Sequence, residues 1–134
     1  VFFIRPDGTV GVLESSKFAA ANEKVQLATQ SGPLLVQSGK IHPVLGPDST
    51  SIRLRNGVGV DTDGRIVFVS SFYHPEKGQT NLYHFAEFFR DTLNCPNALY
   101  LDGDISYVYI RGETGPIKET NWFAGILAIT EPAP

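Results

Sequence analysis

Residues 98–106 read ALYLDGDIS, and this stretch decides how the rest of the chain is organised. Its first four residues are apolar or aromatic without a break, which is typical of a short strand covered on both faces. Asp102 ends this strand, and Gly103 lets the backbone fold back. The oxygen-bearing side chains of Asp104 and Ser106 follow in the bend. Two interpretations fit: a turn in which Asp102 accepts backbone N–H groups, and a site in which a rigid strand end holds reactive oxygens.

The bulk properties of the chain narrow the class of protein. A length of 134 residues fits one domain, and a hydrophobic content of 42% is enough for a core. The net charge of -3 gives no general attraction to nucleic acid or to anionic membranes. No apolar run approaches the roughly 20 residues of a membrane span. Cys95 is the single cysteine, which excludes an internal disulfide, and we interpret it as structural.

The start of the chain is unusual. It begins at Val1, directly in a strand-like run, and the sequence contains no methionine. This predicts a fragment or a processed chain, in which a single domain over residues 1–134 lacks an N-terminal segment. Exposed strand edges in such a domain favour association with the missing segment or with a second chain.

Hydrophobic patterning predicts eight or nine strands and one or two helices. A hairpin is expected at residues 1–13 around Pro6-Asp7-Gly8, and a short helix at 17–21 with Ser15 or Ser16 as its cap. The main helix is expected at 81–93, where apolar residues recur at helical spacing, with Asn81 or Thr80 as its cap. Further strands are expected at 25–29, 34–36, 52–60, 65–71, 98–101, 107–110 and 122–130. Hairpins joined by one helix predict an α+β fold with a mixed, mainly antiparallel sheet and one principal helix packed on it.

Carboxylates two residues apart occur twice in the chain. Asp61 and Asp63 precede a glycine between two strands, which indicates a hairpin turn. Asp102 and Asp104 are less easily explained, and they leave a Ca²⁺ or Mg²⁺ site open. The three histidines form no pair at helical spacing, so zinc is not favoured.

An arginine-rich strand precedes two glycines. Arg53 and Arg55 are two residues apart, so a strand directs both to the same side. Arg55 adjoins Asn56 and Gly57, whose backbone N–H groups could join the guanidinium around a phosphate oxygen. The alternative is a pair of solvated strand arginines. Gly57 and Gly59 weaken the strand unless another group approaches its backbone closely.

Three motifs, taken in order, resemble those of the phosphodiester glycosidase family. They are QSGPLLV at 30–36 with Gly39, RNGVGV at 55–60, and Leu101-Asp102-Gly103 followed by Ser106. The match spans roughly residues 30–109 and is most similar to short bacterial members. Asp104 stands where the family usually has a second glycine, and the asparagine- and glycine-rich segment that precedes these motifs in the family is not seen.

The resemblance implies an α+β fold, hydrolysis of a sugar–phosphodiester bond and an extracytoplasmic location. Asp102 is the expected general acid/base or orienting carboxylate, with Ser106 beside it in the catalytic cleft. His42 and Glu113 are candidates for a second acid/base group. The expected substrate-binding residues are Arg53, Arg55, Asn56, Gly57 and Gly103.

Three function hypotheses therefore stand. The first is a hydrolase acting on a glycosyl phosphodiester or a related cell-envelope glycan. The second is a non-catalytic glycan- or cell-wall-binding domain that retains the cleft. The third is a purely structural interaction module. None of them involves nucleic acid or a membrane span.

Overall fold

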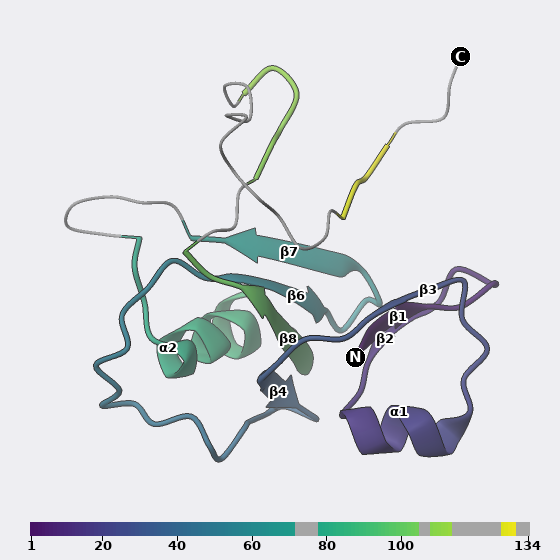
Figure 1. Ribbon diagram of the computed structural model, residues 1–134, viewed down its shortest axis with the longest axis horizontal. Helices are drawn as coiled ribbons and strands as arrows, with labels where there is room; N and C mark the ends of the chain where they lie inside the picture. Colours follow the sequence, from purple (N-terminus) through teal and green to yellow (C-terminus); the bar gives the residue numbers. More distant parts are fainter. Residues whose placement is uncertain (72–77, 105–107, 114–126, 131–134) are drawn as a thin grey trace.

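The computed structural model describes residues 1–71, 78–104, 108–113 and 127–130. Within these residues eight strands form two sheets, in which every paired strand is antiparallel (Figure 1). The smaller sheet has the order β2-β1-β3, from β1 (Phe2–Ile4), β2 (Val10–Val12) and β3 (Leu27–Thr29). The larger has the order β5-β4-β8-β6-β7, from β4 (Leu34–Gln37), β5 (Lys40–Ile41), β6 (Asn56–Val60), β7 (Ile66–Ser70) and β8 (Asn97–Asp102).

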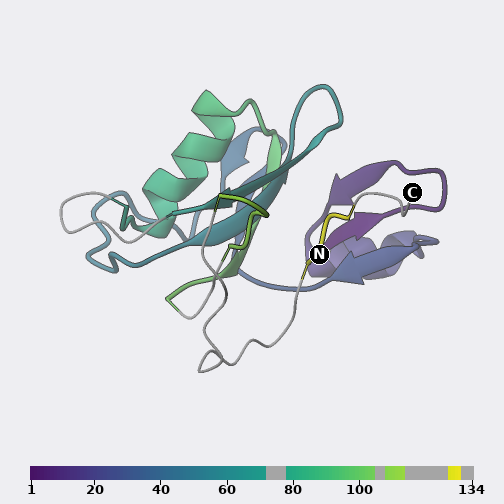
Figure 2. The same ribbon diagram turned by 90° about the horizontal axis from the view of Figure 1, so that it is seen from above.

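Each sheet carries a helix, and Figure 2 shows α2 on the side of the five-stranded sheet that faces away from the three-stranded sheet. Helix α1 (Ser15–Ala21) packs on the three-stranded sheet through Phe18, whose ring centroid lies 5.2 Å from that of Phe3. Helix α2 (Leu82–Glu87) and the π-helical turn η1 (Phe88–Thr92) cover the five-stranded sheet. No helix among the described residues is long and apolar enough to cross a membrane.

Two apolar clusters hold these layers together. The first lies between the sheets and joins Phe2 and Val12 to Leu34, Val58 and Leu99. The second lies under α2 and contains Leu35, Val36, Phe85, Ala86, Phe89, Cys95 and Ala98. Strand β8 contributes to both clusters, because alternate side chains point to opposite faces of a sheet. This agrees with the uninterrupted apolar run before Asp102.

The two glycines of β6 allow α2 to approach the sheet. A Cβ at Gly57 would lie 3.0 Å from ring atoms of Phe85 and Phe89, and one at Gly59 would lie 2.8 Å from the Cys95 sulfur. Side chains there would force the helix away from the sheet. The expectation that something approaches this backbone closely is confirmed, and the approaching group is the aromatic face of α2.

The α+β class and the mainly antiparallel pairing are confirmed, while some details were wrong. The strands form two sheets instead of one, because Phe2 and Val12 bury the second face of β8 and β6. Helix α1 is capped by the Glu14 side chain, not by Ser15 or Ser16. The main helix runs on as a π-helical turn, in which the N–H of Leu93 donates to the carbonyl of Phe88.

Several strand boundaries also differ from expectation. Residues 52–55 form only an isolated bridge between Arg53 and Thr80, and β6 begins at Asn56. The described parts of the last two expected strands, residues 108–110 and 127–130, have no regular structure. The other parts of those two strands lie outside the described residues. Apolar composition alone suggested strands there, but composition does not show which segments pair in a sheet.

Candidate functional site

The end of β8 brings Asp102 next to the start of β6. The sheet register pairs Asp102 with Asn56, and the next pair is Tyr100 with Gly57. Leu101 therefore has no partner on β6 and forms a bulge. Bulges bend a strand and re-aim the side chain beside them. Two of the expected site residues, Asn56 and Asp102, are thus brought together by the sheet itself.

A row of polar side chains crosses three strands at this end of the sheet. Asn56 pairs with Asp102 on one side and with Ser70 of β7 on the other, and directly paired residues share a face. Because Val58 faces the three-stranded sheet and side chains alternate along β6, the row faces the same way. The row ends at Asp102, whose Oδ1 accepts the N–H of Gly103 at 2.7 Å.

Arg55 lies on the other face, against the start of α2, and is only 6% exposed. Its guanidinium donates from Nε to the Thr80 carbonyl at 3.3 Å and from Nη2 to the carbonyl and hydroxyl of Ser51 at 2.8 and 3.1 Å. Its Nη1 donates to the Tyr100 hydroxyl at 3.4 Å, a long hydrogen bond. No carboxylate among the described residues pairs with it. The positive charge is therefore held by neutral oxygens.

Tyr100 supports Arg55 in a second way. The Arg55 guanidinium carbon lies 5.6 Å from the centroid of the Tyr100 ring, within cation–π range. Tyr100 is itself packed against the cluster under α2, so its ring has a fixed place. The expected site residues are thus divided between the two faces of one sheet end, with Arg55 on the α2 side and Asn56 and Asp102 on the other.

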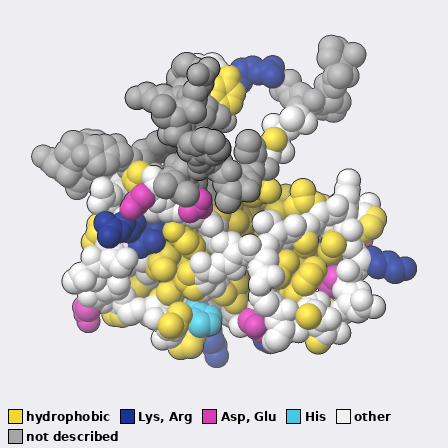
Figure 3. Space-filling model, in the orientation of Figure 1, with side chains coloured by type: hydrophobic (Ala, Val, Ile, Leu, Met, Phe, Trp, Pro, Cys, Tyr) yellow, Lys and Arg dark blue, Asp and Glu magenta, His cyan; other side chains and the backbone are white. Residues whose placement is uncertain are grey.

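Asp104 turns toward the segment before β6 instead of toward Asp102. Its Oδ1 accepts the backbone N–H of Leu54 at 3.0 Å, and its Oδ2 lies 3.6 Å from Nε of Arg53. Both side chains of this ion pair are more than half exposed. Figure 3 shows basic and acidic side chains side by side in the region where β8 ends. Arg53 and Arg55 therefore have different surroundings: Arg53 is exposed beside Asp104, whereas Arg55 is buried, and residues 52–55 are not the regular strand that the sequence predicted.

Gly103 is required for a reason other than the expected turn. It is not among the residues with a positive φ, so its backbone conformation is open to other residues. A Cβ at this position would lie 2.7 Å from the Tyr100 hydroxyl and 3.3 Å from the Leu54 carbonyl. The missing side chain makes room for the phenol of Tyr100.

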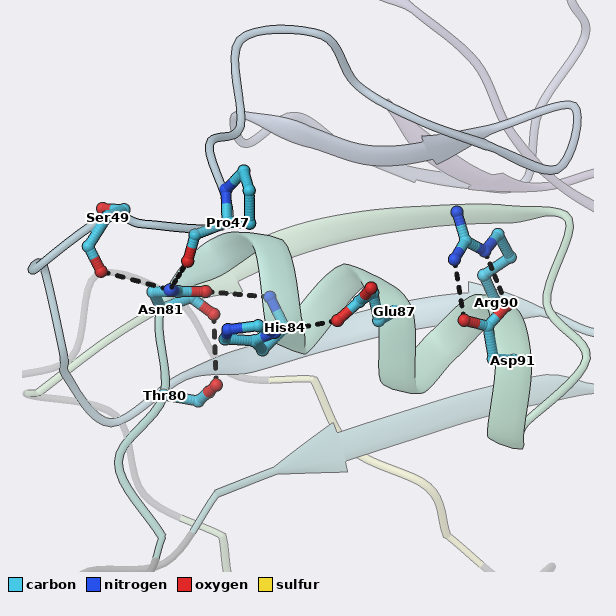
Figure 4. A network of polar contacts seen from close by, with 8 residues as sticks. All are labelled: Pro47, Ser49, Thr80, Asn81, His84, Glu87, Arg90 and Asp91. Atoms are coloured by element: carbon cyan, nitrogen blue, oxygen red, sulfur yellow. Dashed lines mark hydrogen bonds and ion pairs between the residues drawn. The ribbon is translucent and has the colours of Figure 1, made fainter.

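Loop 47–49 is fixed to α2 by the buried side chain of Asn81 (Figure 4). The Asn81 amide donates to the carbonyls of Pro47 and Ser49 at 2.9 and 3.1 Å. Its Oδ1 accepts the His84 N–H at 2.8 Å and so caps the helix. The same loop leads to Ser51, which holds Arg55. The expected cap at the start of this helix is confirmed, and it also anchors the loop beside the candidate site.

The remaining candidate residues lie away from Arg55, Asn56 and Asp102 or outside the residues that the structure describes. His42 follows β5, which β4 separates from β8, and its Nδ1 accepts the Val44 N–H. Glu113 lies in a turn, where its N–H donates to the Ile110 carbonyl. Ser106 lies outside the described residues. Gly57 is in the centre of the sheet under α2, so its required role there is packing, and its predicted role in substrate binding stays a prediction.

Asp61 and Cys95, which the sequence indicated to be structural, have structural surroundings. Asp61 closes the β6–β7 turn and accepts the backbone N–H groups of Asp63 and Arg65 at 3.0 and 2.8 Å. Cys95 is fully buried, and burial raises the pKa of its thiol to about 11. A thiol with that pKa is a poor nucleophile near neutral pH. No group of three His, Cys, Asp or Glu side chains in the described residues could hold a metal ion.

The structure is that of an α+β protein in which a buried arginine without a carboxylate partner among the described residues lies at the same sheet end as an aspartate that ends a strand. Comparison with known proteins assigns the family. The phosphodiester glycosidase family model matches residues 1–122, and the chain belongs to this family. The three ordered motifs had predicted that family, over a shorter stretch.

The chain is also similar to individual proteins and solved structures. The chain is 39% identical over 122 residues to the uncharacterised protein YigE of Escherichia coli K12, covering 86% of this chain and 46% of YigE. It is similar to the catalytic domain of zebrafish N-acetylglucosamine-1-phosphodiester alpha-N-acetylglucosaminidase, solved auto-inhibited by its pro-peptide. That match has a TM-score of 0.59 at 23% identity and covers 78% of this chain and 39% of the zebrafish chain, so it shows a shared fold. A hypothetical protein from Synechocystis matches 57% of this chain and 15% of its own, at 30% identity and a TM-score of 0.47.

Sequence reasoning missed Tyr100, Ser51, Thr80 and Ser70. Tyr100 lies in the apolar or aromatic run that predicts a buried strand, and that pattern does not show that its hydroxyl needs a polar partner when buried. Ser51 and Thr80 contact Arg55 largely through backbone carbonyls, which every residue has, so no sequence signal exists for them. Ser70 is set by the register of β6 with β7, which the sequence does not reveal.

Proposed function

We propose that the protein is a hydrolase of glycosyl phosphodiesters, acting at the end of the five-stranded sheet. The observation that carries the proposal is Arg55, a nearly buried cation whose described partners are all neutral. A buried charge without a counter-charge is costly, and a bound anion would offset that cost. Membership of the phosphodiester glycosidase family supports a phosphodiester as that anion.

The chemistry needs charge balance where the bond breaks. In the proposed reaction the bond between the anomeric carbon and the phosphate oxygen breaks, and a water oxygen bonds to that carbon. The leaving phosphate monoester gains negative charge, which a fixed cation in a low-dielectric setting stabilises. Asp102 takes the proton of the attacking water or orients that water. Asn56, paired with Asp102, offers its side-chain amide as a hydrogen-bond donor to the sugar.

The arrangement suggests how the substrate lies. The phosphate is placed on the α2 side with Arg55, and the sugar on the opposite side with Asn56 and Asp102. The substrate then crosses the end of the sheet instead of lying on one of its faces. The contribution of Ser106 and of a divalent cation to this reaction stays a prediction.

The proposal is tested with N-acetylglucosamine phosphodiesters, including nucleotide-linked ones, and the full-length protein. We expect wild type to release the free sugar, Asp102→Asn to lower kcat by roughly a hundredfold or more, and Arg55→Gln to lower kcat/KM strongly. Asp63→Asn is the matched control, since Asp63 is an exposed carboxylate in the β6–β7 turn.

Two results would count against the proposal. If wild type turns over these substrates no faster than Asp102→Asn, the hydrolase assignment fails. If the wild type binds glycans without releasing product, the protein is instead a non-catalytic glycan-binding domain.

A further inference from the structure

We propose that the Tyr100 hydroxyl is a second anion-binding group, which donates a hydrogen bond to the phosphate that Arg55 attracts. The inference rests on the proposed function, because it names a further residue of the same site. Tyr100 was not among the residues expected from the sequence. Three observations support it: the single unused donor of Arg55, the direction of the Arg55–Tyr100 hydrogen bond, and the space kept open at Gly103.

Arg55 by itself cannot donate two parallel hydrogen bonds to a phosphate. A guanidinium has five N–H donors, and four hydrogen bonds to Thr80, Ser51 and Tyr100 occupy Nε, Nη2 and one position on Nη1. Among the described residues this leaves one donor, on Nη1. Two-pronged arginine recognition of a phosphate needs two adjacent donors. A second donor from another residue is therefore needed for a phosphate to be held in one orientation.

The Tyr100 hydroxyl can supply that donor. It accepts from Nη1 of Arg55, an interaction that uses an oxygen lone pair and leaves the phenolic proton available. No described residue is recorded as its acceptor. Nη1 of Arg55 and the Tyr100 oxygen lie 3.4 Å apart, and each keeps one hydrogen for which the described residues supply no acceptor. Two adjacent donors of this kind match two oxygens of a phosphodiester monoanion.

Gly103 leaves room for the phenol. A methyl group at Gly103 would stand 2.7 Å from the Tyr100 hydroxyl but 4.0 Å from the ring carbon that carries it. The first distance is a clash and the second is ordinary van der Waals contact. A Gly103→Ala change should therefore press on the hydroxyl of tyrosine much more than on the ring of phenylalanine, while its 3.3 Å approach to the Leu54 carbonyl is the same in both backgrounds. Since Gly103 has no positive φ, alanine adds no backbone strain there.

The experiment measures binding of inorganic phosphate to the full-length protein by calorimetry or ³¹P line broadening. We expect Tyr100→Phe to weaken phosphate binding roughly tenfold or more, which is what one hydrogen bond to a charged group contributes. Gly103→Ala should weaken binding in the wild-type background and have a clearly smaller effect in the Tyr100→Phe background, where only the contact with the Leu54 carbonyl remains. Asp63→Asn should leave phosphate binding unchanged.

The outcomes separate this inference from the proposed function. If wild type and Tyr100→Phe bind phosphate equally while Arg55→Gln binds it weakly, the role of Tyr100 is wrong and the Arg55 site stands. If wild type binds no phosphate, the anion site itself is wrong. If Gly103→Ala weakens binding equally in both backgrounds, its effect does not pass through the hydroxyl and the inference is overturned. Thermal unfolding of each variant shows whether it is folded, and Tyr100→Phe removes only one oxygen atom.

Discussion

At the scale of single residues, side-chain hydrogen bonds decide which charged groups are structural. Asp61 is 8% exposed and receives backbone N–H groups together with the Arg65 guanidinium, at 2.7 Å from Oδ2. Hydrogen bonds from the backbone and side chain of Arg65 hold the pKa of the Asp61 carboxyl below its ordinary value of 3.8. Asp102 shares none of these contacts and keeps one recorded hydrogen bond, from Gly103. Two aspartates at strand ends thus have different roles.

The lowered pKa of Asp61 has a pH consequence. A carboxyl whose pKa is lower in the folded state adds stability above its ordinary pKa, and this stability is lost as the pH falls through the folded value. We expect Asp61→Asn to be less stable than wild type at pH 7, with the difference shrinking as the pH falls below about 4. Urea unfolding at a series of pH values measures this. Asp63→Asn is the control. The prediction is contradicted if the difference in unfolding free energy between wild type and Asp61→Asn does not depend on pH.

At the scale of elements, the start of α2 is held by one side chain. Asn81 is 2% exposed, donates two hydrogen bonds to loop 47–49 and accepts one from the His84 N–H in the helix. The sequence indicated the cap, because asparagine is favoured there. It did not indicate the two contacts to the loop, since their acceptors are backbone carbonyls 34 and 32 residues away.

Substitutions at Asn81 separate these two roles. We expect Asn81→Ala to lower the free energy of unfolding by about 2 kcal/mol, because it removes the cap and leaves two carbonyls without their donor. Asn81→Asp keeps an acceptor for the helix but has no amide to donate to the loop. Hydrogen exchange at His84 should therefore speed up in the alanine variant and stay slow in the aspartate variant. Equal exchange in both variants would show that capping does not depend on this side chain.

At the scale of the whole molecule, the two sheets share a core. Phe2 of the three-stranded sheet is 1% exposed and packs against Val58 and Leu99 of the five-stranded sheet. Its ring also meets Phe68 of β7 edge to face, with centroids 6.2 Å apart. Because the two sheets share this core, we expect them to unfold as one cooperative unit.

This coupling can be measured with the single buried cysteine as a probe. We expect Phe2→Ala to destabilise the protein by about 4 kcal/mol, through lost burial and a cavity. Cys95 lies under α2 on the far side of the five-stranded sheet, so its labelling by a thiol reagent reports unfolding there. Labelling should move to lower urea concentration in Phe2→Ala and stay nearly unchanged in the control Phe88→Ala, where the ring is 43% exposed. An unchanged labelling midpoint in Phe2→Ala would show that the sheets unfold separately.

The amino-acid sequence by itself determined most of the strands, the main helix with its cap, and the family. It also indicated that another group approaches the backbone at the two glycines of β6. These follow from local rules: alternation, helical spacing, turn residues and the order of short motifs. Only the tertiary structure decided that Arg55 and Asp102 lie on opposite faces of one sheet end, that Asp104 turns away, and that Gly103 makes room for Tyr100. The physical reason is that a bulge, a register and a hydrogen bond to a distant carbonyl depend on which segments meet. Residues 98–106 therefore mark the site by their pattern, while their neighbours in space assign each oxygen its role.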